Sequence, residues 1–326
     1  MIRRVRIQGY KSLQDVEIHL RPLTVIFGPN AAGKSNLLDA LALLSRMATR
    51  RTIKEAFEGH RGTSLEAFRY DSMGIKGLLS KERAQFMIEV DVELSAPIVE
   101  EVERRIHETA FREELARWRF CYFEPRVMRI PSPIKEAEYL GPFGEDLAAF
   151  YHTLRRKNER QFEVTCRALN SLIPAVERID VQLTPDGFVE LNVVENGIFY
   201  SARVISEGTL RVLGLLAVTN PLSPATLIGY EEPENGVHPR RLRLIAELLK
   251  ETVNRDGVQI IVNTHSPLFP EYFEDEMLVV CRKGPEGTRF ESFSSLGPLF
   301  RRQEIEAGLE ETSPLWLQIV RGDWDG

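Results

Sequence analysis

Residues 28–35 read GPNAAGKS, a glycine-rich pattern that strongly restricts how the surrounding chain can fold. The run matches G-x-x-x-x-G-K-[S/T] in full, with apolar LTVIF before it and apolar-periodic NLLDALALLSRM after it. Gly28 and Gly33 allow the backbone to curl until successive N–H groups point inward and cradle phosphate oxygens. The pattern therefore predicts a strand, a phosphate-binding loop and a helix, in that order.

The residues that follow the second glycine supply charge and a metal ligand. Lys34 can reach the β- and γ-phosphates of a nucleotide, and the Ser35 hydroxyl can ligate Mg²⁺. The N-terminus of the following helix adds about half a positive charge. We therefore expect ATP and Mg²⁺ as cofactors, bound by Gly28, Pro29, Asn30, Ala31, Ala32, Gly33, Lys34, Ser35 and Asn36.

Two later apolar runs end in polar side chains. Glu231 and Glu232 follow TLIGY, and His265 ends IIVNTH. Ligands of open parallel sheets bind beyond the carboxyl ends of the strands, so one glutamate can hold the metal and the next can accept a proton from water. His265 can hydrogen-bond the γ-phosphate. The alternatives are an acidic surface turn before a helix and a histidine satisfied by nearby backbone.

The pattern along the chain is α/β at both ends, with a different stretch between. We expect a core made of residues 1–45 and 201–300, interrupted by an inserted α-helical lid with β-strands at 46–200. Residues 301–326 are expected to form a C-terminal tail that packs on the core. Trp316 and Trp324 make this tail a candidate partner region, and the alternative is that Trp316 docks on the core.

Periodicity predicts individual elements within that arrangement. Strands are expected at 4–7, 16–20, 23–27, 85–94, 226–230 and 258–262. Helices are expected at 98–118, 144–172, 209–218 and 239–253. Hairpins are expected around the turns at 185–187 and 284–287, and the proline-rich stretch 125–142 is predicted to be a linker.

Composition narrows the class of protein. The chain has 326 residues, a net charge of −6 and 43% hydrophobic residues, which is typical of a globular protein. No apolar run approaches the ~20 residues that span a membrane, and no signal peptide is visible, so we expect a cytoplasmic protein. The three cysteines form no CxxC pair, which argues against structural zinc.

Four motifs in the same order resemble those of a known family. These are GPNAAGKSNLLDAL, ISEGT at 205–209, EEPENGVHP at 231–239 and NTHSP at 263–267. Together they resemble the ABC-type ATPases of the RecF/SMC branch and, more closely, compact AAA_21-type ATPases related to the OLD family. The resemblance implies an ABC ATPase-like P-loop NTPase core with a mixed sheet.

The resemblance also implies roles for single residues. Glu231 would be the metal carboxylate, Glu232 the catalytic base and His265 the switch histidine. Ser206 and Gly208 would form the signature motif, which contacts the γ-phosphate of ATP held by the other subunit. Such ATPases form homodimers head-to-tail around two ATP molecules. Residues 235–238 would occupy the D-loop position. Lys11 would contact the nucleotide, with a solvated turn lysine as the alternative.

The chain departs from the family pattern in several places. Glu231 stands where most ABC ATPases have aspartate, and ISEGT differs from the usual LSGGQ. Gln85 is a candidate for the glutamine loop, with an ordinary strand glutamine as the alternative. Heptad arms are absent, and after residue 300 we expect too little chain for a Toprim nuclease domain.

Three functions remain open at this point. The first is a Mg²⁺-dependent ATPase that acts in DNA repair or antiviral defence with a partner protein. The second is a nucleotide-sensing scaffold for a separately encoded nuclease or toxin. The third, the ATPase subunit of a membrane transporter, is disfavoured by the ISEGT signature. DNA is a candidate partner because of two basic runs, whose alternative is a solvated helix face: Arg46, Arg50, Arg51 and Lys54, and Arg155, Arg156, Lys157 and Arg160.

Overall fold

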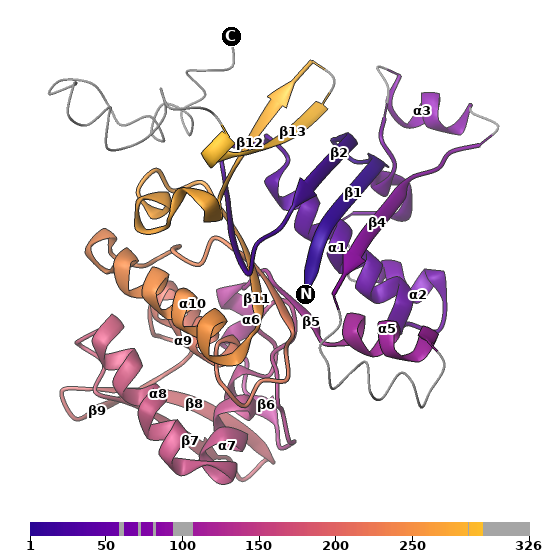
Figure 1. Ribbon diagram of the computed structural model, residues 1–326. Coiled ribbons are helices and arrows are strands. Elements are labelled where there is room, and N and C mark those ends of the chain that lie inside the picture. Colours follow the sequence, from indigo (N-terminus) through magenta and orange to yellow (C-terminus); the bar gives the residue numbers. More distant parts are fainter. Residues whose placement is uncertain (59–61, 71–72, 81–82, 94–106, 286, 296–326) are drawn as a thin grey trace, which may run out of the picture. The chain divides into compact units, whose positions relative to one another are not determined.

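The computed structural model describes residues 1–58, 62–70, 73–80, 83–93, 107–285 and 287–295 (Figure 1). By its internal contacts the chain divides into two compact units. Unit 1 combines Met1–Trp118 with the chain from Val258 onward, and unit 2 is Arg119–Gly257.

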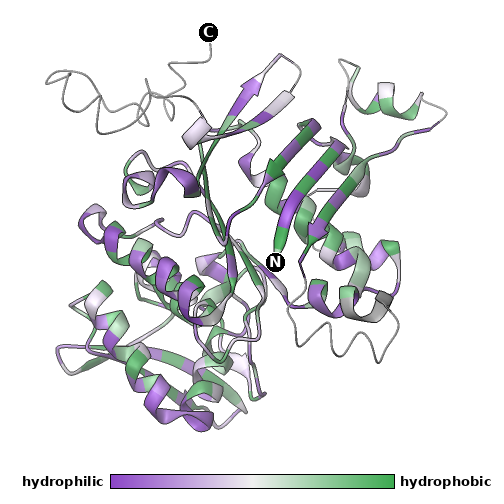
Figure 2. Ribbon diagram, viewed as in Figure 1, coloured by the Kyte–Doolittle hydropathy of each residue, from purple (hydrophilic) through white to green (hydrophobic). Residues whose placement is uncertain are grey.

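An antiparallel sheet begins unit 1. Its strands lie in the order β2-β1-β4, with bounds Leu13–His19, Ile2–Tyr10 and Met87–Val92. Hydropathy alternates along these strands (Figure 2), so Val5 and Ile7 are buried while Arg4 lies on the other face. There Arg4 forms ion pairs with three carboxylates of the neighbouring strands: Glu17, Glu89 and Asp91.

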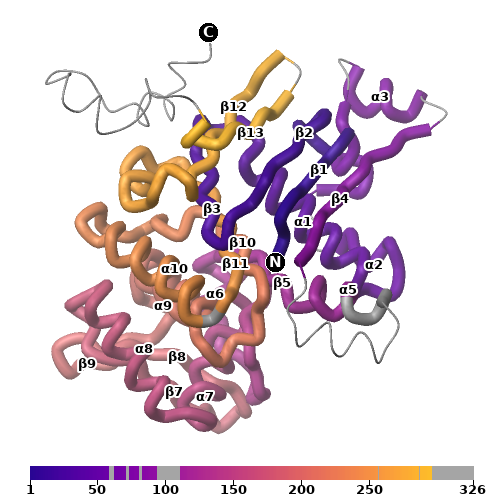
Figure 3. The backbone as a smooth tube through the Cα atoms, in the orientation of Figure 1, coloured from indigo at the N-terminus to yellow at the C-terminus, as the bar shows by residue number. Residues whose placement is uncertain are grey.

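A second set of strands in unit 1 carries the predicted loop. In order they are β13 (Gly287–Ser292), β12 (Leu278–Gly284), β3 (Leu23–Phe27) and β11 (Gln259–Thr264). β3 is parallel to both β11 and β12, whereas β13 is antiparallel to β12, which makes the sheet mixed. Figure 3 traces the path of the chain through these segments. Every residue of β3 and β11 is buried, as expected for strands covered on both faces.

One long helix and several short ones complete unit 1. α1 (Lys34–Thr49) contacts β1 and β4 of the first sheet and β11 of the second. The others are α2 (Ile53–Phe57), α3 (Gly74–Leu79), α5 (His107–Ala116), and the 3₁₀ turns Ser64–Ala67, Phe269–Tyr272, Asp275–Met277 and Phe293–Ser295. α5 confirms the helix predicted at 98–118 between His107 and Ala116 only. Trp118 begins a strand instead, and residues 98–106 lie outside the described residues.

Unit 2 is richer in helix. Its helices are α6 (Pro125–Met128), α7 (Leu147–Lys157), α8 (Glu159–Leu172), α9 (Glu207–Val218) and α10 (Leu242–Asp256), the last preceded by the 3₁₀ turn Pro239–Arg241. α9 packs against α6, α7 and α8. β5 (Trp118–Cys121) and β10 (Leu227–Glu231) are neighbouring strands.

A small antiparallel sheet in unit 2 packs on α7. β8 (Phe188–Glu195) pairs with β7 (Arg178–Leu183), β9 (Ile198–Ser201) and β6 (Ser132–Pro133). The turns predicted at 185–187 and 284–287 do connect antiparallel strands. The linker predicted at 125–142 is wrong in part, because α6 and β6 lie within it.

Along the chain, the boundaries between the two compact units fall at 118/119 and 257/258. The predicted boundaries between core and insertion fall at 45/46 and 200/201. The predicted domains therefore stay a prediction, and the tail at 301–326 with its two tryptophans lies outside the described residues. No helix in the described part of the chain is long and apolar enough to cross a membrane.

The three cysteines are buried as free thiols. Burial raises the pKa of Cys121 and of Cys281 to about 12. Burial also raises the pKa of Cys166. Because the thiolate is the reactive form, these side chains behave as small apolar core residues.

Candidate nucleotide-binding site

The phosphate loop, residues 28–35, leaves the buried end of β3 and enters α1. Gly28 and Gly33 have φ angles of 149° and 109°, which L side chains rarely adopt. A Cβ on Gly28 would lie 2.0 Å from the carbonyl oxygen of Cys281, and one on Gly33 would lie 2.2 Å from Oγ1 of Thr288. Backbone conformation and close packing against the β12–β13 hairpin therefore both require glycine at these positions.

The loop lysine is folded back over the loop. Lys34 is only 8% exposed, and its ammonium donates hydrogen bonds to the carbonyl oxygens of Gly28 and Pro29, each at 2.8 Å. Its charge therefore lies directly against the backbone that is predicted to bind phosphate. The next residue, Ser35, accepts a hydrogen bond from the side-chain amide of Asn263 on β11, at 3.5 Å.

His265 leaves the sheet beside the loop. In the parallel pairing of β11 with β3, Thr264 lies opposite Phe27, so the residues that follow them, His265 and Gly28, emerge at the same edge. The Thr264 hydroxyl accepts a hydrogen bond from the Ser266 amide at 2.9 Å, which fixes the turn after the strand. The structure thus brings the predicted switch histidine to the phosphate loop.

Lys11 has a structural contact of its own. It lies in the β1–β2 turn with a φ of 47°, and its ammonium forms an ion pair with Asp39 of α1. The Tyr10 hydroxyl donates to the same carboxylate oxygen at 2.7 Å. Lys11 therefore ties the turn to α1, and its contact with a nucleotide stays a prediction.

The two predicted glutamates lie in unit 2, where β10 ends. Glu231 is the last residue of the strand, and Glu232 has a φ of 53°, an uncommon conformation for a residue with a side chain. The Asn235 side-chain amide donates to the Glu232 carboxylate, and the Asn235 backbone N–H donates to the Glu232 carbonyl at 3.0 Å. A tight turn thus holds Glu232 in place.

The signature segment, ISEGT at 205–209, leads into α9 in the same unit. Ser206 is the N-cap, because its hydroxyl accepts a hydrogen bond from the Thr209 amide at 3.0 Å. A Cβ on Gly208 would lie 2.0 Å from the carbonyl oxygen of Gly236. The segment at the predicted D-loop position therefore packs backbone to backbone against the signature segment.

Two family models match the chain. One, described as "AAA domain, putative AbiEii toxin, Type IV TA system" (AAA_21), matches residues 95–269, more than half of the chain. The chain belongs to the AAA_21 family. The second model, described as an AAA ATPase domain, matches residues 1–64 of the chain, which include the phosphate loop.

Two curated proteins are similar to this chain. An OLD nuclease of Thermus scotoductus is 23% identical over 87% of this chain and 62% of its own length. A DNA replication and repair protein RecF of Natranaerobius thermophilus is 30% identical over 26% of this chain and 20% of its own length. The chain thus spans less than two thirds of either relative.

Solved structures share the fold. An Smc head bound to the C-terminal winged-helix domain of ScpA has a TM-score of 0.55 at 15% identity, covering 89% of this chain and 97% of that one. An Smc head with an extended coiled coil from Pyrococcus furiosus also has a TM-score of 0.55, at 13% identity, covering 95% and 99%. With the family models and relatives, they identify an ABC-type P-loop ATPase of the RecF/SMC/OLD branch, as the motifs indicated.

The predicted metal ligands are one hydroxyl and one carboxylate, Ser35 and Glu231. Within the ranges that the structure describes, no three His, Cys, Asp or Glu side chains gather as a metal cluster. Mg²⁺ bound with a nucleotide needs only one or two protein ligands, because phosphates and water supply the rest. Ser35, at the first turn of α1, and Glu231, at the end of β10, have suitable oxygen atoms for this limited role.

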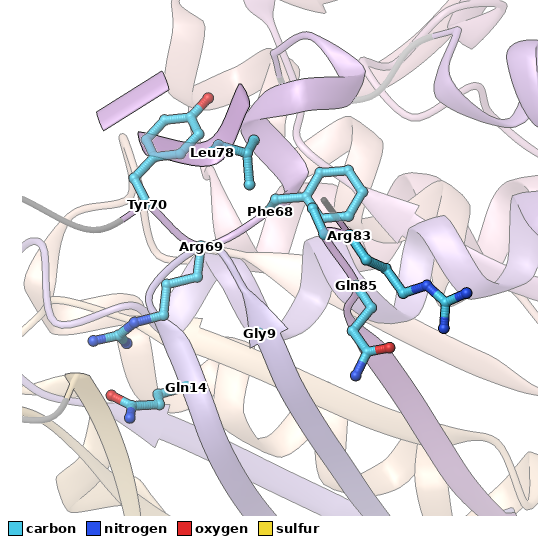
Figure 4. A pocket seen from close by; sticks show the side chains of 9 residues that line it. Gly9, Gln14, Phe68, Arg69, Tyr70, Leu78, Arg83 and Gln85 are labelled. Carbon is cyan, nitrogen blue, oxygen red and sulfur yellow. The ribbon is translucent and has the colours of Figure 1, made fainter. Parts of the chain in front are cut away.

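A pocket of about 420 Å³ lies over Gly9, at the end of β1 (Figure 4). Arg69 and Gln14 line one side of the pocket, and Arg83 and Gln85 line the other. A guanidinium nitrogen of Arg69 lies 3.5 Å from the Ser12 carbonyl oxygen, so the pocket adjoins the β1–β2 turn. Gln85 is exposed here, and its glutamine-loop role stays a prediction.

The structure also shows contacts that sequence reasoning missed. Thr288 donates a hydrogen bond to the phosphate loop at Ala32, and Ser12 is hydrogen-bonded to Thr288. Arg129 donates a hydrogen bond to the carbonyl of Ile205, the first residue of the signature segment, at 3.0 Å. No local pattern marks these residues, because each lies far along the chain from the segment that it holds. Only the packing of distant segments reveals them.

Proposed function

We propose that this protein binds ATP with Mg²⁺ and hydrolyses the bond between its β- and γ-phosphates, giving ADP and phosphate. The observation that carries the proposal is the phosphate loop, a full GPNAAGKS pattern between a buried strand and a helix. Its glycines have conformations and contacts that exclude other residues, and His265 emerges beside it. Membership of a P-loop ATPase family supports the same chemistry.

Different residues of the chain would bind the phosphates, hold the metal and accept the proton. The loop amides and Lys34 would bind the phosphates, with the ammonium exchanging the Gly28 and Pro29 carbonyls for phosphate oxygens. Ser35 and Glu231 would hold Mg²⁺, which when bound neutralises phosphate charge. Glu232 would accept the proton of the attacking water, and His265 would hydrogen-bond the γ-phosphate. The turn at Asn235 supports the role of Glu232, because a base must be held in position.

The first test compares hydrolysis and binding in two variants. We expect wild-type protein to release phosphate from ATP, and Glu232→Gln to retain ATP binding while turnover falls about 100-fold or more. Lys34→Ala should lose binding, because it removes the cation from the phosphates. Wild-type turnover no higher than that of Glu232→Gln, or ATP hydrolysis by Lys34→Ala at the wild-type rate, would contradict the proposal.

We further propose that ATP assembles a head-to-tail homodimer, in which Ser206 and Gly208 of one subunit contact the ATP of the other. The support is the family resemblance together with the start of α9, where the N-cap residue Ser206 is exposed. Sedimentation of Glu232→Gln should show a dimer with ATP and Mg²⁺ and a monomer without them. A monomer under saturating ATP would contradict the trans arrangement.

A second candidate function is a nucleotide-dependent scaffold for a separately encoded nuclease or toxin, acting in DNA repair or antiviral defence. The similarity to an OLD nuclease supports an association with nuclease chemistry. The test is a pull-down with Glu232→Gln in the presence and absence of ATP. A partner retained only with ATP would support the scaffold, and no difference would argue against it.

We also propose DNA as a partner of the two basic runs, the second of which is partly neutralised by ion pairs. Arg155 forms an ion pair with Asp180, and Lys157 forms ion pairs with Glu136 and Glu138, so part of the second run is neutralised. DNA binding measured with ATP at two salt concentrations tests the proposal. Phosphate contacts predict a steep loss of affinity with salt.

A further inference from the structure

Thr288 connects the β12–β13 hairpin to the phosphate loop. It lies on β13, is 3% exposed, and its hydroxyl donates a hydrogen bond to the Ala32 carbonyl at 2.7 Å. The same oxygen lies 2.6 Å from the Ser12 hydroxyl, and the Thr288 N–H donates to the Ser12 carbonyl at 3.1 Å. A buried threonine thus joins the loop to the β1–β2 turn.

The direction of this hydrogen-bond chain is fixed by its two ends. The Ala32 carbonyl can only accept, so the Thr288 hydroxyl uses its proton there. Ser12 must therefore donate to Thr288, and Ser12 in turn accepts from the Asn36 side-chain amide at 2.8 Å. Every group in the relay, from Asn36 through Ser12 and Thr288 to Ala32, has a donor or acceptor role that fits its neighbours.

Holding the Ala32 carbonyl sets the direction of the next amide. In a trans peptide the C=O and N–H point in opposite directions, and no cis peptide is found in the described residues. With the Ala32 oxygen held toward Thr288, the N–H of Gly33 points away from Thr288. Oriented N–H groups of this kind form the phosphate cradle.

We propose that Thr288 is a positioning residue of the phosphate loop, which orients the Gly33 amide through the Ala32 carbonyl and thereby raises the affinity for ATP. This inference rests on the proposed binding of ATP at the loop. Thr288 acts on the loop backbone from the side of β13, so it contributes to nucleotide binding and not to the attack of water.

The experiment measures the dissociation constant of ATP·Mg²⁺ by titration calorimetry. Thr288→Val keeps the side-chain shape but removes the hydroxyl, and we expect affinity to fall roughly three- to tenfold, the effect of one net hydrogen bond. Thr288→Ser keeps the hydroxyl and should bind ATP as wild type does. In steady-state assays, KM should rise for Thr288→Val while kcat stays the same.

Thr24→Val is a matched control. Thr24 is 1% exposed on β3, and its hydroxyl is hydrogen-bonded to the backbone of Arg21, at the end of the strand away from the loop. This variant should lose stability, as Thr288→Val does, but keep the wild-type affinity for ATP. An equal loss of affinity in both variants would mean a general structural effect and would overturn the inference.

A second variant tests the relay without altering Thr288. Ser12→Ala should also weaken ATP binding, and the double variant Ser12→Ala/Thr288→Val should bind no more weakly than Thr288→Val alone, because both changes break one chain. Fully additive losses, or wild-type affinity in both single variants, would overturn the inference alone. A wild-type protein that binds no ATP would overturn the proposed function and the inference with it.

Discussion

Left-handed backbone occurs at three of the predicted functional positions. Among the described residues, five that are not glycine have positive φ, and three of them, Lys11, Ala31 and Glu232, are predicted site residues. Each such residue costs about 1–3 kcal/mol and persists only where surrounding contacts hold it. Those contacts are visible for two of them, since Asp39 holds Lys11 and Asn235 holds Glu232.

Gly208→Ala tests the backbone contact between the signature segment and Gly236. The new Cβ would lie 2.0 Å from a carbonyl oxygen, which backbone movement alone can relieve. We expect the free energy of unfolding to fall by about 2 kcal/mol or more, measured by urea denaturation. As a control, Gly187→Ala adds a Cβ that meets nothing within 4 Å, so only its left-handed φ of 81° costs about 1 kcal/mol. Equal losses would contradict the steric argument.

At the scale of elements, the β2-β1-β4 sheet carries a charge network centred on Arg4. Hydrogen bonding to Arg4 lowers the pKa of Asp91 below its usual value. A carboxylate with a lowered folded pKa stabilises the fold above its unfolded pKa, and this contribution is lost as the pH falls through the folded pKa.

Arg4→Met should therefore reduce stability at neutral pH, and the difference from wild type should shrink as the pH falls below about 4. Thermal unfolding across that pH range measures the difference. Because the pairs are exposed, 1 M salt should also reduce it. A difference that stays constant with pH and salt would show that Arg4 acts through packing of its aliphatic stem instead.

Elements with a strong local pattern could be predicted from the sequence. The buried run LTVIF became β3 with the expected bounds, and the first phosphate-loop residues follow it directly. The docking of the β12–β13 hairpin against Gly28 and Gly33 could not be predicted, because Cys281 and Thr288 lie some 250 residues away. Periodicity reports which face of an element is buried, but not which distant element covers it.

The candidate site shows the same division. Glu231 and His265 could be predicted as site residues, because polar residues at the end of apolar runs are a local signal in the sequence. The turn that holds Glu232 through Asn235, and the packing of Gly236 on Gly208, depend on backbone geometry that the sequence does not encode as a pattern.

At the scale of the whole molecule, the three thiols should be inert while the protein is folded. With pKa values of about 12, Cys121 and Cys281 carry almost no thiolate near neutral pH, and burial raises the pKa of Cys166 as well. A chromogenic disulfide reagent at pH 7.5 should react slowly with native protein and rapidly with three thiols in guanidinium chloride. A native thiol that reacts at the rate of a free cysteine would contradict the burial.

Silent thiols make the natural chain a convenient background for site-directed labelling. Val204 is 71% exposed and lies two residues before Ser206, so a cysteine introduced there would be the preferred target of a maleimide dye. No native cysteine would need to be replaced, and the core would keep its packing. A fluorophore at that position would report, in real time, whether the start of α9 becomes covered when nucleotide is added.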